Sequence, residues 1–178
     1  MVIYYQDSLF SPRPYRVADR GDFSLTLTPE ALSTWQKKVY NFQQQVRGAS
    51  VSQTSLFSDM NFSPLDPFKL PIYPEDFYRL DQASSDACIY FVCDLDAYLI
   101  LYIGETNNLQ KRWQGLHDCK KYLQQYRSVS RSTIGFSFYW QAPMPKRSRQ
   151  RLEKSLILHW RSPFNKENWQ YWHTPFIC

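Results

Sequence analysis

Residues 87–104, ACIYFVCDLDAYLILYIG, contain two short runs of apolar, β-branched and aromatic side chains. The first run covers Ala87 to Cys93 and the second covers Tyr98 to Gly104. The intervening DLDA has the composition of a turn. Two runs of this kind joined by a short polar connection predict a β-hairpin, from which the remaining elements can be placed.

A third strand and two helices are predicted after the hairpin. Residues Ser132 to Ala142 alternate between large apolar and smaller or polar side chains, which predicts a strand with one buried face. A helix is predicted to begin near Asn107, because Asn107 and Gln110, three residues later, together resemble a capping box. Its expected core contacts are Leu109, Trp113, Leu116 and Leu123. A basic helix follows from Lys146 to Trp160. We therefore expect an α+β fold with a small three-stranded antiparallel sheet flanked by helices.

The N-terminal part, residues 1–84, is predicted to be an extension of the domain formed by residues 85–178. Within it, Thr28 can cap a helix from Pro29 to Arg47, and Phe23–Leu27 is a strand candidate. Residues 49–86 contain closely spaced prolines, which forbid a continuous helix and discourage a central strand. They are Pro64, Pro67, Pro71 and Pro74.

Composition excludes several classes of protein. The 178 residues are 43% hydrophobic and 21% charged, which is typical of a globular chain. No apolar run is long enough to cross a membrane, and the N-terminus lacks the pattern of a secretory signal. The low cysteine count predicts reduced thiols and a cytoplasmic protein. The 4 cysteines form no C-x-x-C pair, the histidines stand apart and no glycine-rich loop occurs. Zinc knuckles, histidine-based triads and nucleotide-binding loops therefore have no motif here.

The positive charge of the chain lies in its second half. Residues 1–84 carry 8 basic and 9 acidic side chains, and residues 85–178 carry 13 basic and 7 acidic ones. A basic half of this kind favours a polyanionic partner such as nucleic acid. A solvated cationic surface with no such partner is the alternative.

Side chains able to take part in catalysis recur through the second half. This part of the chain, over about residues 87–168, resembles the GIY-YIG nuclease family. The resemblance is carried by Cys88-Ile89-Tyr90, Tyr102-Ile103-Gly104, Lys111-Arg112-Trp113, Glu153 and Pro163-Phe164-Asn165. It implies a three-stranded antiparallel sheet with flanking helices and an endonuclease that hydrolyses DNA phosphodiesters with one divalent cation.

The resemblance also implies a role for each of these side chains. Tyr90 and Tyr102 would position and deprotonate a water molecule. Arg112 would lower the pKa of the phenols and grip phosphate oxygens. Glu153 would hold Mg²⁺ or Mn²⁺, and Asn165 would fix the geometry of the metal site by hydrogen bonding. Taken singly, each residue also has a structural explanation, as a strand aromatic, a solvated helix residue, an ion partner or a turn residue.

Two residues depart from the pattern of the family. Cys88 replaces the first glycine, and Glu105 follows the second motif. Glu105 could bring a second carboxylate near the metal or point to solvent, and we do not assign it to the site. These departures leave open a catalytically inactive nucleic-acid-binding module that retains the fold. A protein-interaction scaffold that uses its aromatic side chains is a third hypothesis. His117 could assist the site, but a lone histidine more often packs or faces water, and it is not assigned to the site either.

Further predictions concern partners. The basic side chains expected to contact DNA phosphates are Lys111, Lys120, Lys121, Arg147, Arg149 and Arg151. The peptide Gln53-Thr54-Ser55-Leu56-Phe57 resembles the pentapeptide with which bacterial replication and repair proteins dock on the sliding clamp, although its apolar residues could simply pack on the domain. The substrate form, the oligomeric state and a role in repair, restriction or mobility stay open. No known DNA-reading motif is present, which favours structure-selective or weakly specific cutting.

Overall fold

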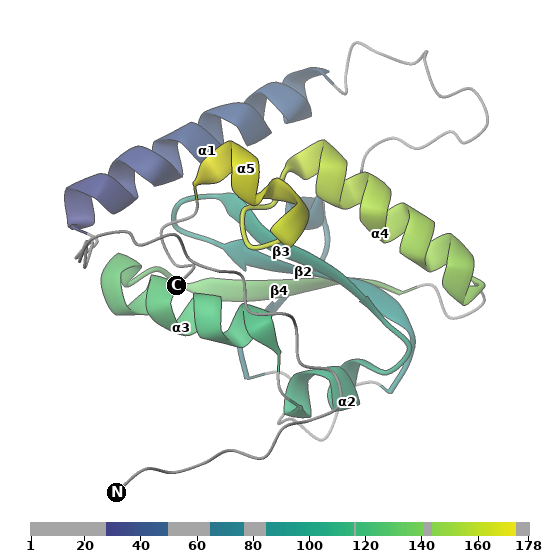
Figure 1. Cartoon of the computed structure of the whole chain (residues 1–178). Coiled ribbons are helices and arrows are strands. Elements are labelled where there is room, and N and C mark those ends of the chain that lie inside the picture. The colour runs from purple at the N-terminus through teal and green to yellow at the C-terminus, as the bar shows by residue number, and fades with distance from the viewer. Residues whose placement is uncertain (1–27, 50–64, 77–84, 116, 141–143, 174–178) are drawn as a thin grey trace, which may run out of the picture.

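The structure, a computed structural model, describes residues 28–49, 65–76, 85–115, 117–140 and 144–173 (Figure 1). Its strands are β1 (Ile72–Pro74), β2 (Cys88–Asp94), β3 (Leu99–Thr106) and β4 (Ile134–Trp140). Its α-helices are α1 (Pro29–Ala49), α2 (Leu109–Gln114), α3 (Asp118–Ser130), α4 (Lys146–Trp160) and α5 (Trp169–Trp172). Two short 3-10 helices are η1 (Pro67–Lys69) and η3 (Lys166–Asn168).

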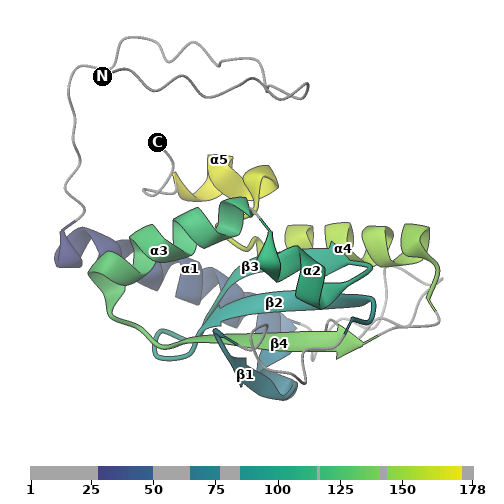
Figure 2. The ribbon, with the colours of Figure 1, turned by 90° about the horizontal axis from the view of Figure 1, so that it is seen from below.

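The strands form one antiparallel sheet in the order β1-β4-β2-β3 (Figure 2). The α+β prediction and the hairpin are confirmed, but the predicted count of three strands is wrong because β1 adds a fourth. β1 comes from the proline-spaced segment and pairs Tyr73 with Phe136 of β4. It lies at the outer edge of the sheet, where Pro74 is tolerated because an edge strand leaves one row of its N–H groups unpaired.

Both faces of the sheet are buried. Alternate residues of β2 belong to two separate clusters: Tyr90 packs with Trp113 of α2, whereas Phe91 packs with Leu156 of α4. We call the face of the sheet that carries Tyr90 and packs against Trp113 the Tyr90 face. In Figure 1, α2 and α3 lie below the sheet and α4 lies above it, whereas α1 runs along the β3 edge and contributes residues to both clusters. The prediction of one buried face for β4 is wrong, because Ser137, on its supposed polar side, is fully buried and donates to the Pro67 carbonyl oxygen at 3.0 Å.

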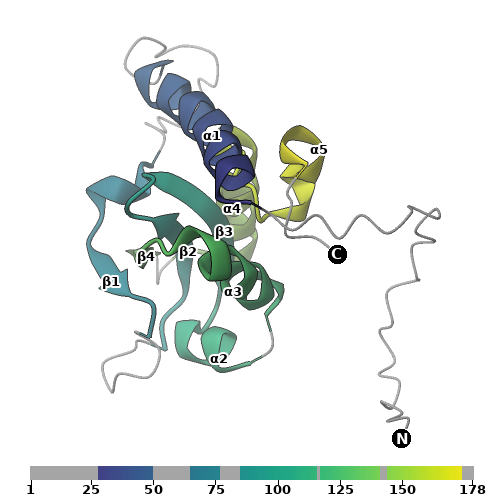
Figure 3. The ribbon, with the colours of Figure 1, turned by 90° about the vertical axis from the view of Figure 1, so that its left-hand side faces the viewer.

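Helix α1 packs against the same sheet. The Thr28 hydroxyl oxygen accepts a hydrogen bond from the Ala31 N–H at 3.2 Å, which confirms the predicted N-cap. Leu32 and Val39 lie in the buried cluster that contains Tyr90. Helix α1 therefore shares a core with the residues that follow position 85, and the domain boundary placed there stays a prediction. Figure 3 shows β1 at the sheet edge away from α1 and α4.

The outer edge of β3 is closed by groups from outside the sheet. The buried Gln43 amide of α1 accepts from the Ile100 N–H at 2.9 Å and donates to the Ile100 carbonyl oxygen at 2.9 Å. The Phe164 N–H donates to the Leu101 carbonyl oxygen at 2.9 Å. Side chains from α4 and from the turn after it bond the backbone farther along this strand. The edge thus satisfies its hydrogen bonds without a further strand.

The segment after the hairpin contains two helices where one was predicted. Helix α2 ends at Gln114, and α3 begins at Asp118. The N-cap of α2 is Asn108, whose side chain accepts from the Lys111 N–H at 2.9 Å, so the capping box predicted at Asn107 is wrong by one residue. By contrast, α4 has both of its predicted bounds.

Some expectations cannot be compared with the structure. The strand at Phe23–Leu27, the clamp-like peptide Gln53–Phe57 and the core contact of Leu116 lie outside the described residues. Within the described ranges, none of the helices combines the length and the apolar character needed to cross a membrane.

Candidate active site

The two tyrosines of the candidate site lie on neighbouring strands. Tyr90 of β2 pairs with Gly104 of β3, and Tyr102 lies two residues before that glycine. The tyrosine rings are stacked, with centroids 6.0 Å apart and planes at 29°. A Cβ atom on residue 104 would lie 2.4 Å from Cζ and Oη of Tyr90 and 2.9 Å from Cε1 of Tyr102. A glycine is therefore required at this position so that both rings can cross the strand closely.

Two N–H donors converge on the Tyr90 oxygen. Arg112 Nε donates at 3.4 Å, and His117 Nε2 lies at 2.8 Å. His117 is the N-cap of α3, and its Nδ1 accepts from the Cys119 N–H at 3.0 Å. A neutral imidazole that accepts at Nδ1 carries its proton on Nε2. Burial, assisted by the charge of Arg112, lowers the pKa of His117 to about 4, so the ring is neutral at pH 7 and donates to Tyr90.

The contact of His117 with Tyr90 was not assigned by sequence reasoning. His117 follows the end of α2, and its position before Asp118 fits an N-cap of α3. That local signal does not reveal that the other ring nitrogen meets Tyr90, 27 residues earlier. The ring of Trp113 stacks on His117 with centroids 5.0 Å apart, which fixes the orientation of the imidazole.

The phenols are more buried than the sequence suggested. Burial, with the neighbouring Tyr102, raises the pKa of Tyr90 well above its usual value, although the Arg112 hydrogen bond and charge oppose this. Burial likewise raises the pKa of Tyr102 to about 12. We expected Arg112 to lower these values, but in this structure the loss of solvent has the larger effect. Both hydroxyls are protonated at pH 7 in the protein alone.

Glu153 reaches the same region from α4. Its Oε1 accepts a hydrogen bond from the Glu105 N–H of β3 at 2.8 Å. Burial raises the pKa of Glu153 to about 7, with a smaller contribution from the Glu105 carboxylate, and Arg112 is among the charges that oppose the rise. The Glu153 charge in turn contributes to the raised pKa of Tyr102. The structure thus brings Tyr90, Tyr102, Arg112 and Glu153 within electrostatic reach of one another.

Glu105 and Arg149 form a buried ion pair beside Glu153. Arg149 Nε lies 2.9 Å from Glu105 Oε1, and the two side chains are only 5% and 8% exposed. The same guanidinium donates to the Met144 carbonyl oxygen at 2.6 Å and to the Asn107 side chain. Glu105 therefore neither points to solvent nor offers a free carboxylate. The prediction of Arg149 as a DNA contact is withdrawn, because its donors are used inside the protein.

Asn165 bonds the backbone of β3. Its Oδ1 accepts from the Ile103 N–H at 3.0 Å and its Nδ2 donates to the Ile103 carbonyl oxygen at 2.8 Å. The Ser162 hydroxyl donates to the same Oδ1 at 2.6 Å. Through these hydrogen bonds the buried Asn165 holds in place the part of β3 between Tyr102 and Gly104. This is a positioning contact made through the backbone.

The remaining predicted DNA contacts lie on three helices. Lys111, Lys121, Arg147 and Arg151 are exposed. Lys120 is half-buried, and its Nζ donates to the carbonyl oxygens of Trp113 and Gly115. That ammonium closes the C-terminal end of α2, so its first role in this structure is local.

The donors near Glu153 suit a hard divalent cation. In the part of the chain that the structure describes, no three His, Cys, Asp or Glu side chains gather to hold a metal ion by themselves. Mg²⁺ does not need such a cluster, since it retains several waters and is often bound by one or two carboxylates plus phosphate. Glu153 is the carboxylate available, because Glu105 is paired with Arg149. Among the described residues, only the Glu105 N–H bonds the Glu153 carboxylate, and it does so at Oε1.

Comparison with known proteins agrees with this geometry. Residues 86–168 match the family model described as the GIY-YIG catalytic domain. The resemblance to the GIY-YIG nuclease family is therefore shown for residues 86–168, the part of the chain that contains the candidate site. Nucleases of this family generally use divalent metal ions, and a nuclease domain implies a nucleic-acid substrate. Searches among curated proteins and among solved structures gave no match.

Proposed function

We propose that this protein is a metal-dependent DNA endonuclease that hydrolyses phosphodiester bonds at the Tyr90 face. The convergence of two tyrosines, an arginine and a half-buried glutamate from four different elements supports the proposal. Such a group supplies the elements that phosphodiester hydrolysis requires: an oriented water, positive charge at the phosphate and a place for a cation.

Each side chain has a distinct role in this proposal. The hydroxyls of Tyr90 and Tyr102 orient the attacking water. In the reactive form the Tyr90 phenol has lost its proton to bulk solvent, and the phenolate oxygen then accepts a proton from that water. Arg112 and His117 stabilise that ionised oxygen through two N–H donors. Arg112 is also exposed, so its remaining donors can bind a non-bridging phosphate oxygen.

The proposed cofactor is Mg²⁺, with Mn²⁺ as a substitute. Glu153 would hold the ion, and a bound divalent cation supplies Lewis-acid stabilisation for the leaving oxygen. The Glu105 N–H orients the Glu153 carboxylate, and Asn165 holds the strand that carries this N–H. DNA is the proposed substrate and the cytoplasm the proposed location. Docking of Gln53–Phe57 on a sliding clamp stays a prediction.

Two contacts in the structure weigh against the catalytically inactive alternative. That alternative rested on Cys88 and Glu105, the departures from the pattern of the family. Cys88 is fully buried in the core, and Glu105 is held by Arg149. Neither side chain takes the place of a proposed catalytic group, so the departures leave the proposed site intact.

A cleavage panel tests the proposal. Plasmid, flap, junction and single-stranded DNA are incubated with the full chain, with and without Mg²⁺ or Mn²⁺. The variant Glu153→Gln keeps an acceptor for the Glu105 N–H but loses the charge, and we expect it to reduce cleavage at least about 100-fold while DNA binding in chelator is kept. Glu30→Gln, an exposed carboxylate on α1, is the matched control. Absence of cation-dependent cleavage of every substrate by the unmutated chain would refute the enzyme and favour a binding module.

A further inference from the structure

Strands β1 and β4 carry an exposed group of aromatic rings. Tyr73 and Trp140 are each 39% exposed. Phe138 contacts both, with ring centroids 5.2 Å from Tyr73 and 5.3 Å from Trp140. We call these three residues the aromatic surface. The ring planes of Tyr73 and Trp140 are tilted by 48° and 41° from the plane of Phe138.

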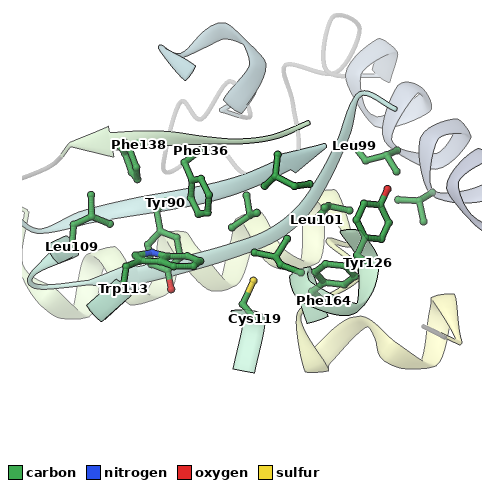
Figure 4. Packing of buried hydrophobic residues seen from close by; sticks show 14 of the residues in the cluster. Tyr90, Leu99, Leu101, Leu109, Trp113, Cys119, Tyr126, Phe136, Phe138 and Phe164 are labelled. Atoms are coloured by element: carbon green, nitrogen blue, oxygen red, sulfur yellow. The ribbon is translucent and has the colours of Figure 1, made fainter. Parts of the chain in front are cut away.

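The aromatic surface continues the Tyr90 face of the sheet. Phe138 is the cross-strand partner of Tyr90, and Tyr73 is that of Phe136. Cross-strand partners share one face of a sheet. Figure 4 shows Phe136 and Phe138 projecting from β4 toward the side on which Tyr90 and Trp113 lie. The exposed rings are therefore an extension of the candidate active site on one continuous face.

Basic side chains lie beside this surface on the side of Tyr73. On the Tyr73 side, a hollow of about 460 Å³ opens between α3 and the end of β1. Its two cations already have partners in the protein. Arg127 pairs with Glu75, and Lys120 donates to backbone carbonyl oxygens of α2. The Arg127 and Glu75 side chains are 52% and 38% exposed, so this pair can open to a phosphate. Stacking rings beside cations are the combination that binds single-stranded nucleic acid without sequence preference.

We propose that the aromatic surface stacks unpaired bases, so that the DNA cut at the Tyr90 face contains a single-stranded segment next to the cleaved bond. The predicted position of the cut rests on the proposed nuclease function, whereas the predicted binding of unpaired bases does not. Bases inside a duplex offer their faces only to neighbouring bases, whereas unpaired bases can stack on protein rings. A protein partner would not explain why the exposed rings continue the face that carries the two tyrosines.

The sheet geometry sets the distance between surface and cut. Strand β1 lies two strands away from β2, which is about 10 Å at the usual strand spacing of about 4.8 Å. Stacked nucleotides rise about 3.4 Å each. The required unpaired bases should therefore begin within about three nucleotides of the cleaved bond.

Binding is tested first, without divalent cations, so that cleavage does not interfere. Fluorescence anisotropy with labelled oligothymidine of about 12 nucleotides is compared with a duplex of equal length. Tyr73→Ala and Trp140→Ala should each weaken binding of the single strand by about 5-fold to 100-fold. Tyr73→Phe and Trp140→Phe keep a ring and should restore most of the affinity. Tyr40→Ala on α1 removes an equally exposed tyrosine, 39%, away from this face and should change nothing.

The outcomes separate this inference from the proposed function. If all variants bind the single strand with equal affinity, the aromatic surface is not a base-binding site. The same conclusion follows if the duplex binds more tightly than the single strand and the ring substitutions do not change that affinity. If the protein cleaves duplex plasmid and the ring substitutions do not change the cleavage rate, the aromatic surface is again refuted as a base-binding site, whereas the nuclease proposal stands. Ring-dependent binding without any cleavage would support the surface and refute the nuclease. In the active protein, cuts mapped on gapped duplexes should follow the gap at a distance of about three nucleotides.

Discussion

Gly104→Ala is the substitution with the most direct effect on the candidate site. The new Cβ would lie 2.4 Å from Cζ and Oη of Tyr90, whereas ordinary contacts begin at 3.4 Å. The Tyr90 ring must therefore retreat by about 1 Å, away from the positions set by His117 and Arg112. A misplacement of that size costs about 100-fold in rate. Overpacking of this kind also destabilises a fold by about 1–3 kcal/mol.

The assay is nicking of a DNA substrate by the full chain with Mg²⁺, alongside thermal unfolding. Rates are compared at a temperature at which both proteins are folded, so that lost stability is not read as lost catalysis. Gly48→Ala is the control, because nothing lies within 4 Å of its added Cβ. If Gly104→Ala cuts at a rate within threefold of the unmutated chain, the position of the Tyr90 ring does not limit the reaction and the reasoning is wrong.

Three further predictions concern stability. Gln43→Ala leaves two backbone groups at the β3 edge without partners and should cost about 2–5 kcal/mol in urea unfolding, whereas Gln45→Ala, in an exposed position of the same helix, should cost less than about 0.5 kcal/mol. Arg149→Met leaves the buried Glu105 carboxylate unpaired and should cost about 3–5 kcal/mol by the same measurement; a loss below 1 kcal/mol would contradict the ion pair. The folded pKa of Glu153, about 7, exceeds the unfolded value of 4.5, so the folded state binds more protons between these values and stability should fall as pH rises from 4.5 to 7. Glu153→Gln should remove that part of the pH dependence, and unchanged slopes of unfolding free energy against pH would show that burial does not perturb this carboxyl.

Local sequence signals predicted the elements that depend on local chemistry. Pro145 and the Ser162-Pro163 pair bound α4 within the sequence itself, and the predicted ends of that helix are confirmed. The hairpin followed from two apolar runs and a polar turn. The break between α2 and α3 was not predicted, because His117 satisfies the first turn of α3 with an imidazole instead of a common capping side chain.

The remaining differences arise from contacts between distant segments. Strand β1 was missed because its prolines oppose a strand, and only pairing with β4, more than 60 residues later, stabilises it. Ser137 was expected to face solvent, but the Pro67 segment covers it. Arg149 was grouped with surface cations, since only the fold brings Glu105 to it. The order of these side chains along the chain indicated a site: Tyr90, Tyr102, Arg112 and Glu153. Their hydrogen-bond partners could not be predicted, because only the fold brings them together.

The closed edge of β3 limits how this protein can associate. An open edge strand is a template for β-augmentation, but here Gln43, Phe164, Asn165 and Glu153 occupy its backbone groups. The opposite edge is β1, which has 3 residues and ends in proline. Self-assembly by strand pairing is therefore opposed at both borders of the sheet. Detachment of α1 or α4 would uncover β3, so loss of these helices is the step at which a stressed chain becomes prone to aggregate.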